Sequence, residues 1–235
     1  MNEKTLLSTK NLSRLQEEVL LRAGFSVESY DAIEIIDVDF EAPEFIENAI
    51  FTSQNGVRSF FENKTGSTRI KQCFCVGQKT ELLLKKNGQN VVKTAKNASE
   101  LAHFIINNHK NDSFSFICGS HRKEDIPKLL KQGKIPVFEL KTYKTMLKPR
   151  HFDQKWGHIL FFSPTGVESF IEGQKAGESA PNITANYFTN TTAICIGDTT
   201  ATAAKKYTSN VIVAHSTTVG SVIDAAVKTI AHDKD

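Results

Sequence analysis

The chain has 235 residues and a formal net charge of +3; 40% of its residues are hydrophobic and 23% are charged. This composition is ordinary for a soluble globular protein, and so small a net charge argues against a nucleic-acid-binding surface. No apolar run approaches the roughly 18 residues of a membrane span, and the first residues lack the apolar core of a signal peptide, so we expect a cytoplasmic protein. The length suits two lobes of about 100 residues, each with its own core.

The cysteines and histidines show no metal-binding pattern. The four cysteines lie in apolar, strand-like runs without Cys-x-x-Cys spacing, which favours reduced core thiols over disulfides or zinc ligands; they are Cys73, Cys75, Cys118 and Cys195. The seven histidines are scattered singly, and none forms a helical ligand pair with a carboxylate. We therefore expect no metal site.

The first forty residues predict one βα unit followed by a crossing. Residues 4–10 are typical of a strand, and residues 12–23 place apolar side chains on one helical face before Gly24 ends the helix. From Phe25 to Phe40, apolar and acidic residues alternate, as in an exposed strand or a two-stranded connector. We interpret this segment as a crossing between lobes.

An internal repeat dominates the rest of the chain. Residues 50–62 align with residues 160–172, and their thirteen pairs include seven identities. Each copy predicts a strand, a tight turn and a helix, and brings Ser53 or Ser163 to the helix N-terminus. Unpaired N–H groups and the helix dipole make such a turn suitable for a carboxylate or phosphate. A single serine is more often a simple cap, but the two copies favour a paired anion site.

A second pair of turns follows the first. Residues 73–80 align with residues 193–200, and a ten-residue insertion, which we place within residues 172–182, separates the two registers. Thr80 and Thr200 fall at or just inside the next helix, where they act as caps or as ligand-binding hydroxyls. The adjacent hydroxyls of Thr199 and Thr200 exceed what a cap needs, which makes this turn the stronger candidate.

Two further segments carry polar candidates. Residues 113–119 predict a buried strand, after which Arg122 and Lys123 offer either a carboxylate-binding pair or a solvated charge cluster. Residues 135–145 alternate and are typical of an extended ribbon that pairs with residues 33–41. Tyr143 lies at the far end of this ribbon.

The order of elements predicts an α/β fold with two similar lobes, each a parallel sheet flanked by helices, and a two-stranded ribbon that joins them. We expect one discontinuous lobe of residues 1–32 and 148–235, an inserted lobe of residues 44–134, and a ribbon of residues 33–43 and 135–147. Such sheets bind ligands beyond the carboxyl ends of their strands, and the cleft between lobes is the default site.

Together these motifs resemble the uroporphyrinogen-III synthase family over nearly the whole chain. The resemblance is carried by Gly119 with Arg122 and by residues 6–10, 51–57, 76–80, 137–145, 161–167 and 196–201. Its most specific part is Phe-Phe-Ser-Pro-x-Gly at 161–166, followed by Ile-Gly-x-Thr-Thr-Ala at 196–201. Lys10 stands where the family commonly has arginine, and Gln54 and Asp198 replace prolines. A lysine offers a carboxylate a point charge in place of the two-pronged arginine fork.

The resemblance implies that hydroxymethylbilane binds in the cleft. The implied reaction removes its terminal hydroxyl as water, attacks the substituted carbon of the last pyrrole through a spiro intermediate, and closes the ring with that pyrrole inverted. The product is uroporphyrinogen III, which serves haem, sirohaem and cobalamin biosynthesis. No cofactor or metal is implied, and we expect a monomer.

The resemblance also implies roles for the polar residues. The eight substrate carboxylates would meet N–H and hydroxyl donors at the turns. Tyr143, which matches the family's ribbon tyrosine, would donate a proton to the leaving hydroxyl, because a phenol is neutral at pH 7; the alternative is an amphipathic side chain that covers the lobe junction. The substrate-binding candidates are Ser53, Thr80, Arg122, Ser163, Thr165, Gly166, Thr199 and Thr200.

Two other classes of protein compete with this interpretation. A two-lobed protein that binds an anionic ligand without catalysis would share the fold, but such proteins are commonly exported and carry a signal peptide. A transferase that uses nucleotides or sugar phosphates would need a glycine-rich phosphate loop, and no G-x-G-x-x-G or Walker sequence follows a predicted strand.

Overall fold

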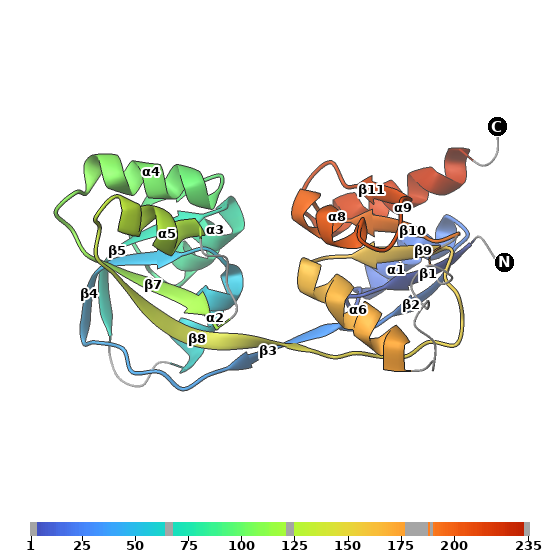
Figure 1. Cartoon of the computed structure of the whole chain (residues 1–235), viewed down its shortest axis with the longest axis horizontal. Coiled ribbons are helices and arrows are strands. Elements are labelled where there is room, and N and C mark those ends of the chain that lie inside the picture. Colours follow the sequence, from blue (N-terminus) through green and yellow to red (C-terminus); the bar gives the residue numbers. More distant parts are fainter. Residues whose placement is uncertain (1–3, 64–67, 121–124, 177–187, 189, 233–235) are drawn as a thin grey trace. The chain divides into compact units, whose positions relative to one another are not determined.

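The computed structural model describes residues 4–63, 68–120, 125–176, 188 and 190–232. The chain divides into two compact units: a discontinuous unit of Met1–Glu34 and Met146–Asp235, and an inserted unit of Ile35–Thr145. Each unit contains a largely parallel sheet covered by helices, which confirms the predicted α/β class (Figure 1). None of the described helices is long and apolar enough to cross a membrane.

The inserted unit contains a six-stranded sheet in the order β3-β8-β7-β4-β5-β6. Its strands are β3 (Ile33–Asp37), β4 (Phe45–Phe51), β5 (Arg69–Val76), β6 (Val91–Ala95), β7 (Phe114–Gly119) and β8 (Val137–Leu147). Its helices are α2 (Gln54–Asn63), α3 (Gln78–Lys86), α4 (Ala98–Asn108) and α5 (Asp125–Gln132). Core residues of α2 and α3 pack on one face of the sheet, and those of α4 and α5 pack on the other.

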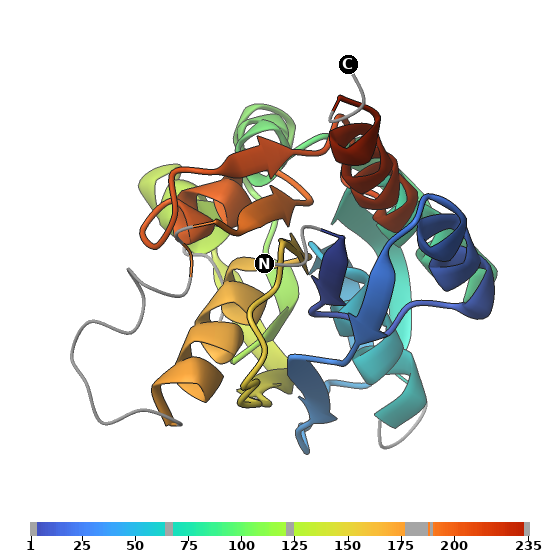
Figure 2. The same ribbon diagram turned by 90° about the vertical axis from the view of Figure 1, so that its right-hand side faces the viewer.

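The discontinuous unit contains a five-stranded parallel sheet in the order β11-β10-β9-β1-β2. Its strands are β1 (Thr5–Ser8), β2 (Ser26–Ser29), β9 (His158–Phe161), β10 (Thr192–Cys195) and β11 (Val211–Val213). Its helices are α1 (Arg14–Arg22), α6 (Pro164–Ala176), α8 (Asp198–Ala204) and α9 (Val219–His232). Figure 2 shows α6 and α8, in orange shades, on one side of this sheet and α1 and α9, in blue and dark red, on the other.

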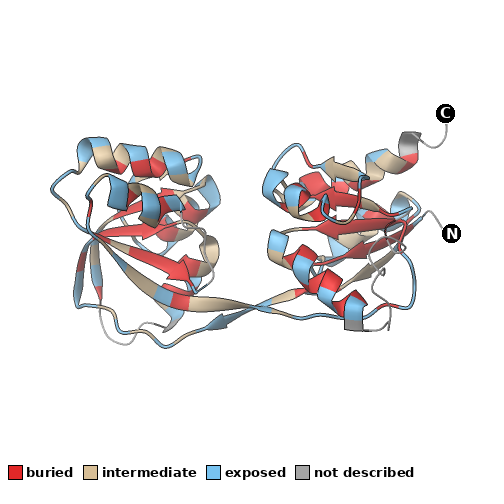
Figure 3. Cartoon of the chain, viewed as in Figure 1, coloured by how far each residue is buried: buried red, intermediate tan, exposed pale blue. Residues whose placement is uncertain are grey.

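Local sequence explains where these elements begin. Ser13 starts α1 with a capping box, in which its side chain accepts the N–H of Gln16 and the Gln16 side chain accepts the N–H of Ser13. The central strands are apolar on both sides because helices cover both faces of each sheet. In Figure 3 the central strands are accordingly buried, while the helices alternate between buried and exposed residues.

The two sheets share one spatial order. The strand order β6-β5-β4-β7-β8 in the inserted unit corresponds to the order β11-β10-β9-β1-β2 in the discontinuous unit. In the discontinuous unit, β1 and β2 come before the other strands along the chain. The burial classes of residues 73–80 and 193–200 are identical position by position. The repeat seen in the sequence is therefore a repeat of structure. In each unit the strand order reverses beside the strand that carries the repeated serine turn, which is where open α/β sheets bind ligands.

The connecting segments differ in part from the prediction. The segment from Phe25 to Phe40 is not a single crossing, because β2 pairs with β1 inside the sheet of the discontinuous unit. Likewise, β8 is more than a connecting ribbon. It pairs in parallel with β7 and lies between β7 and β3 in the inserted sheet. Alternating polar and apolar residues suit an edge strand of a sheet as well as a free ribbon, so the pattern alone does not separate the two. The N–H of Val38 donates to the carbonyl of Thr142, as that of Lys148 does to Ala32, so β3 and β8 are antiparallel.

Candidate functional site

Three residues meet at the carboxyl end of the inserted sheet. Ser53 follows β4, Gly119 ends β7, and Tyr143 lies opposite Gly119 on β8. The Oγ of Ser53 lies 3.0 Å from the phenolic oxygen of Tyr143, within hydrogen-bond distance. The strand order reverses between β4 and β7, so this contact lies where such sheets hold ligands.

Ser53 has two roles at this turn. Its Oγ accepts the N–H of Gly56 at 3.1 Å, as an N-cap does, so the simple capping role considered for it is present. A hydroxyl has one proton and two lone pairs. With one lone pair taken by Gly56, Ser53 can either donate its proton to Tyr143 or accept the phenolic proton. The serine therefore couples the N-terminus of α2 to the phenol.

Burial controls the ionisation of Tyr143. It raises the pKa of the Tyr143 phenol above the ordinary 10, the Ser53 hydrogen bond opposes this rise, and the nearby Cys118 thiol adds to it. A phenol whose pKa is 10 or higher is protonated throughout the neutral range, so Tyr143 is neutral there. When the proton leaves, Ser53 can donate its own hydrogen bond to the phenolate. The arrangement has the features of a general acid.

The matching turn of the discontinuous unit carries different groups. The Oγ of Ser163 accepts the N–H of Gly166 at 2.9 Å. A Cβ on Gly166 would lie 3.2 Å from that oxygen and 3.6 Å from Oγ1 of Thr9, so the residue after β1 reaches the same turn. Thr9 is buried and donates to the carbonyl of Leu160. The tyrosine that follows β2, Tyr30, packs its ring against Phe152 in the core.

The second pair of turns differs from the prediction in one respect. Thr200 is only 2% exposed and Thr80 only 5%, so their side chains face the interior, and Gly77 and Gly197 occupy the cap positions without a side-chain hydrogen bond. The N–H groups of Thr80 and Thr200 bond to the carbonyls of these glycines. Thr199, in contrast, is exposed. Of the two adjacent hydroxyls at this turn, that of Thr199 is exposed and that of Thr200 is buried; a binding role for either stays a prediction.

The charges beside these two turns also differ. Lys79 is exposed in the first turn of α3, whereas Asp198 is exposed at the first position of α8. A lysine supports the binding of a carboxylate at a helix N-terminus, and an aspartate already supplies a negative charge there. Of the two turns, the one at α3 is therefore the more attractive to an acidic ligand.

The remaining candidates are placed as follows. Thr165 is partly exposed in the first turn of α6, beside Ser163 and Gly166. Arg122 lies outside the described residues. Sequence reasoning missed the parts played by Thr9, Ser59 and Thr142. Ser59 left a signal in the sequence, because it is one of the identities of the repeat and its hydroxyl donates to the carbonyl of Thr142.

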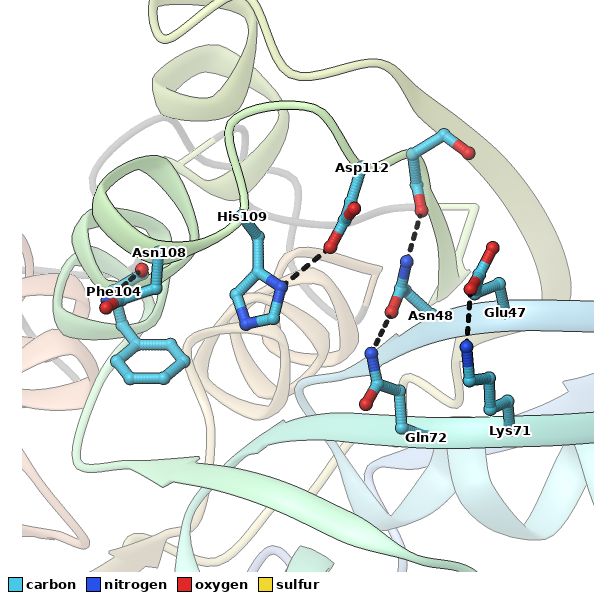
Figure 4. A network of polar contacts seen from close by, with 9 residues as sticks. Glu47, Asn48, Lys71, Gln72, Phe104, Asn108, His109 and Asp112 are labelled. Carbon is cyan, nitrogen blue, oxygen red and sulfur yellow. Dashed lines mark hydrogen bonds and ion pairs between the residues drawn. The ribbon is translucent and has the colours of Figure 1, made fainter.

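A second polar region lies at the opposite end of the inserted sheet. The Nδ2 of Asn48 donates to the carbonyl of Ser113. Figure 4 shows Gln72 donating to Oδ1 of Asn48, with the ion pairs Lys71–Glu47 and His109–Asp112 nearby. Next to this network is an open cavity of about 430 Å³, whose lining includes Phe45, Asn48 and Phe138. None of the candidate site residues lines it. Because the Asn48 amide already bonds Ser113 and Gln72, the network has a structural role in joining β4, β5 and the start of β7.

No metal site is evident in the part of the chain that is described: within residues 4–63, 68–120, 125–176, 188 and 190–232, no three His, Cys, Asp or Glu side chains are grouped to hold an ion. The four cysteines are buried and form no disulfide. Burial raises the pKa of the Cys73 and Cys195 thiols to about 12. These thiols therefore behave as core side chains, as the sequence predicts.

Solved structures of similar fold cover almost the whole chain. The uroporphyrinogen-III synthetase of Helicobacter pylori has a TM-score of 0.68 at 16% identity, over 96% of this chain and 99% of that one. A mutant uroporphyrinogen III synthase of the extremely thermophilic bacterium Thermus thermophilus also has a TM-score of 0.68, at 15% identity, over 97% of this chain and 99% of that one. At these identities the likeness establishes the fold.

Sequence comparison identifies the family. The porphyrin biosynthesis protein HemD of Ruminiclostridium josui is 27% identical over 88% of this chain, and the match spans only 44% of that longer protein. The family model described as uroporphyrinogen-III synthase HemD matches residues 13–224. Because this match covers most of the chain, the protein belongs to the uroporphyrinogen-III synthase family.

Proposed function

We propose that this protein is a uroporphyrinogen-III synthase that converts hydroxymethylbilane to uroporphyrinogen III, with Tyr143 as the general acid. The observation that carries the proposal is the contact between Tyr143 and Ser53, which sets a protonated phenol at the ligand-binding edge of the inserted sheet. The membership of residues 13–224 in the family supports the choice of substrate. In this role Tyr143 acts on the hydroxyl that leaves.

The reaction is a dehydration with no net redox change. The phenol of Tyr143 gives its proton to the terminal hydroxyl, the carbon–oxygen bond breaks, and water leaves. The resulting electrophilic carbon is attacked by the substituted carbon of the last pyrrole, which gives the spiro intermediate. That intermediate rearranges, the ring closes with the last pyrrole inverted, and the pyrrole regains its aromaticity by losing a proton. This proton balances the one that Tyr143 supplied, so one bilane yields one macrocycle and one water.

Ser53 supports the acid in both of its protonation states. Before the transfer, the neutral phenol shares a hydrogen bond with the Ser53 hydroxyl. During the transfer, negative charge develops on the phenolic oxygen, and Ser53 can donate a hydrogen bond to it from the N-terminus of α2. Donors that are already in place stabilise developing charge without having to reorganise.

The helix N-termini supply the binding groups for the substrate carboxylates. The turns after β4 and β5 in the inserted unit, and those after β9 and β10 in the discontinuous unit, each end a parallel strand and begin a helix. Helix N-termini favour anions through their free N–H groups and dipole. On this basis Ser53, Ser163, Thr165, Gly166 and Thr199 belong to binding turns. Thr80 and Thr200, whose side chains are buried, support those turns from beneath.

The two units then contribute unequally to the reaction. The edge of the inserted unit has a phenol and a lysine, Tyr143 and Lys79, while the matching edge of the discontinuous unit has Thr9 and Asp198. Tyr143, a group that can donate a proton near neutral pH, therefore lies on the edge of the inserted unit. We assign the chemical step to the inserted unit and carboxylate binding to both.

Further predictions belong to this proposal. The reaction would make the protein a cyclising hydro-lyase that uses no cofactor. A monomeric state and a cytoplasmic location stay predictions from the sequence.

The test is the isomer of the ring product. Without catalysis, hydroxymethylbilane closes to the type I isomer, in which the last ring is not inverted. Purified protein given freshly made bilane should yield the type III isomer, and heat-denatured protein should yield type I. A two-lobed protein that only binds anions would retain the bilane without changing the isomer. Recovery of type I alone from folded protein would reject the proposal.

A further inference from the structure

The direction of the Tyr143 side chain depends on an irregularity in β8. Successive side chains of a strand point to opposite faces, and Leu140 packs with the core formed by α2 and α3. Counting on from Leu140, residue 142 would face α2 and residue 143 would face away. The phenol of Tyr143 nevertheless reaches Ser53 at the start of α2.

The pairing register accounts for this change of direction. Cys118 on β7 lies opposite Lys141, but the next residue, Gly119, lies opposite Tyr143. Thr142 is therefore an extra residue on β8, which is the arrangement of a β-bulge. Bulges redirect the side chains that follow them and are frequent beside active sites. Here the extra residue turns Tyr143 towards Ser53.

Gly119 provides the space that the redirected ring needs. A Cβ at this position would lie 2.7 Å from Cε2 and 2.8 Å from Cζ of Tyr143, closer than any ordinary contact between carbon atoms. The backbone of Gly119 does not have the positive φ that would by itself require glycine. The requirement for glycine therefore comes from the tyrosine ring.

Helix α2 then holds this part of β8 at two points. Its N-cap, Ser53, bonds the phenol, and Ser59, further along the same helix, donates a buried hydrogen bond to the carbonyl of Thr142. Ser59 is 2% exposed and Thr142 is fully buried. The bulge and the tip of the side chain are thus both tied to one rigid element, a condition for accurate placement of a reacting group.

We propose that Gly119 and Ser59 are positioning residues for Tyr143, and that the bulge at Thr142 exists to direct its phenol to Ser53. Gly119 gives the ring its space, and Ser59 fixes the bulge to α2. The inference rests on the proposed function, because it assigns these residues to the step in which Tyr143 donates a proton.

The first test is Gly119→Ala, with Gly220→Ala as the matched control. The new Cβ must move the ring by about 0.7 Å to restore an ordinary contact of 3.4 Å. We expect kcat to fall about 100-fold and KM to change less than about threefold, since a displaced reacting group impairs the chemical step. Gly220 has no atom within 4 Å of an added Cβ, so Gly220→Ala should keep wild-type kcat.

A double variant separates positioning from a general effect on folding. If Gly119 acts through the phenol, adding Gly119→Ala to Tyr143→Phe should lower kcat no further, because the acid is already absent. The Phe ring still meets the new Cβ, so the loss of folding stability should be equal in both backgrounds. Wild-type kcat in Gly119→Ala, or an equal loss of kcat in both backgrounds, would overturn the proposal for Gly119.

The second test is Ser59→Ala, with Ser169→Ala as the control from the other copy of the repeat. Ser169 is also buried, and among the described residues its hydroxyl has no hydrogen-bond partner. Ser59→Ala should lower kcat about tenfold without a matching change in KM, and Ser169→Ala should leave kcat unchanged. An equal effect of the two substitutions would refute the role of Ser59. This arm also decides the proposal if Gly119→Ala fails to fold.

A measurement without substrate separates this inference from the proposed function. In a crystal structure of Gly119→Ala, the Ser53 Oγ to Tyr143 oxygen distance should exceed about 3.5 Å, beyond hydrogen-bond range. An unchanged contact would overturn the inference even in an active enzyme. Conversely, if the wild-type protein makes no type III product but the ring moves as expected, the proposed function fails and the positioning of Tyr143 stands.

Discussion

Replacing Tyr143 by phenylalanine removes the proposed acid and little else. The ring that fills the space beside Gly119 is kept, and only the phenolic oxygen with its 3.0 Å contact to Ser53 is lost. Ser53 keeps the N–H of Gly56 and is partly exposed, so its free proton can bond to water. The lost hydrogen bond should therefore lower the free energy of unfolding by only about 1 kcal/mol, or about 2–4 °C in Tm.

The effect of the same change on catalysis should be much larger. A positioned general acid contributes about 10²–10⁴-fold to a rate, which corresponds to about 2.7–5.4 kcal/mol in the activation free energy. We expect kcat to fall within this range while KM changes by less than about threefold, because the proposal assigns carboxylate binding to other groups. The assay is the initial rate of type III formation from fresh bilane, compared with a denaturant unfolding curve for each protein.

The pH dependence gives an independent check on this assignment. In the proposed mechanism the protonated phenol is the active form. Because its pKa is raised, kcat should be steady through the neutral range and fall only as the pH rises above 10. That alkaline fall should be absent in Tyr143→Phe. A variant with wild-type kcat, or one whose activity falls only in proportion to its lost stability, would remove Tyr143 from the mechanism.

Three further predictions concern the turns and the core. Ser163→Ala removes the cap of α6 and should lower the free energy of unfolding by about 1 kcal/mol, seen as a lower denaturant midpoint. Thr199→Ala should raise KM with little loss of stability. Thr200→Ala, at a buried position, should mainly lower the denaturant midpoint, with a smaller effect on KM. The reverse pattern would contradict the burial described. The thiols of Cys73 and Cys195 should resist alkylation at pH 7 and react on unfolding, as read by mass spectrometry.

Most of the fold could be predicted because the chain repeats itself. The identities between residues 50–62 and 160–172 report a shared requirement: an apolar strand, a serine cap and a glycine close to that cap. The structure has these features in both copies, with Gly56 and Gly166 donating to Ser53 and Ser163. Local patterns of this kind depend on neighbours in sequence, so one sequence is enough to recognise them.

The details of the site depend on how strands and helices pack in the tertiary structure, so they are harder to predict from the sequence. Thr80 and Thr200 face the sheet because of how α3 and α8 are rotated about their own axes. The spacing of these threonines after a glycine does not determine that rotation. The bulge at Thr142 appears only when β8 is paired with β7. The need for Gly119 follows from the position of the Tyr143 ring, 24 residues further along the chain. Alternation along residues 135–145 would instead have directed that ring to the other face.

The most direct test of the central claim is the fraction of type III product as a function of enzyme concentration. Catalysed closure with inversion competes with spontaneous closure to type I, so the type III fraction should rise with wild-type enzyme until it reaches a plateau. For Tyr143→Phe the same curve should be displaced to concentrations about 10²–10⁴-fold higher. A type III fraction that stays at zero at every concentration, or superimposable curves for the two proteins, would contradict the account.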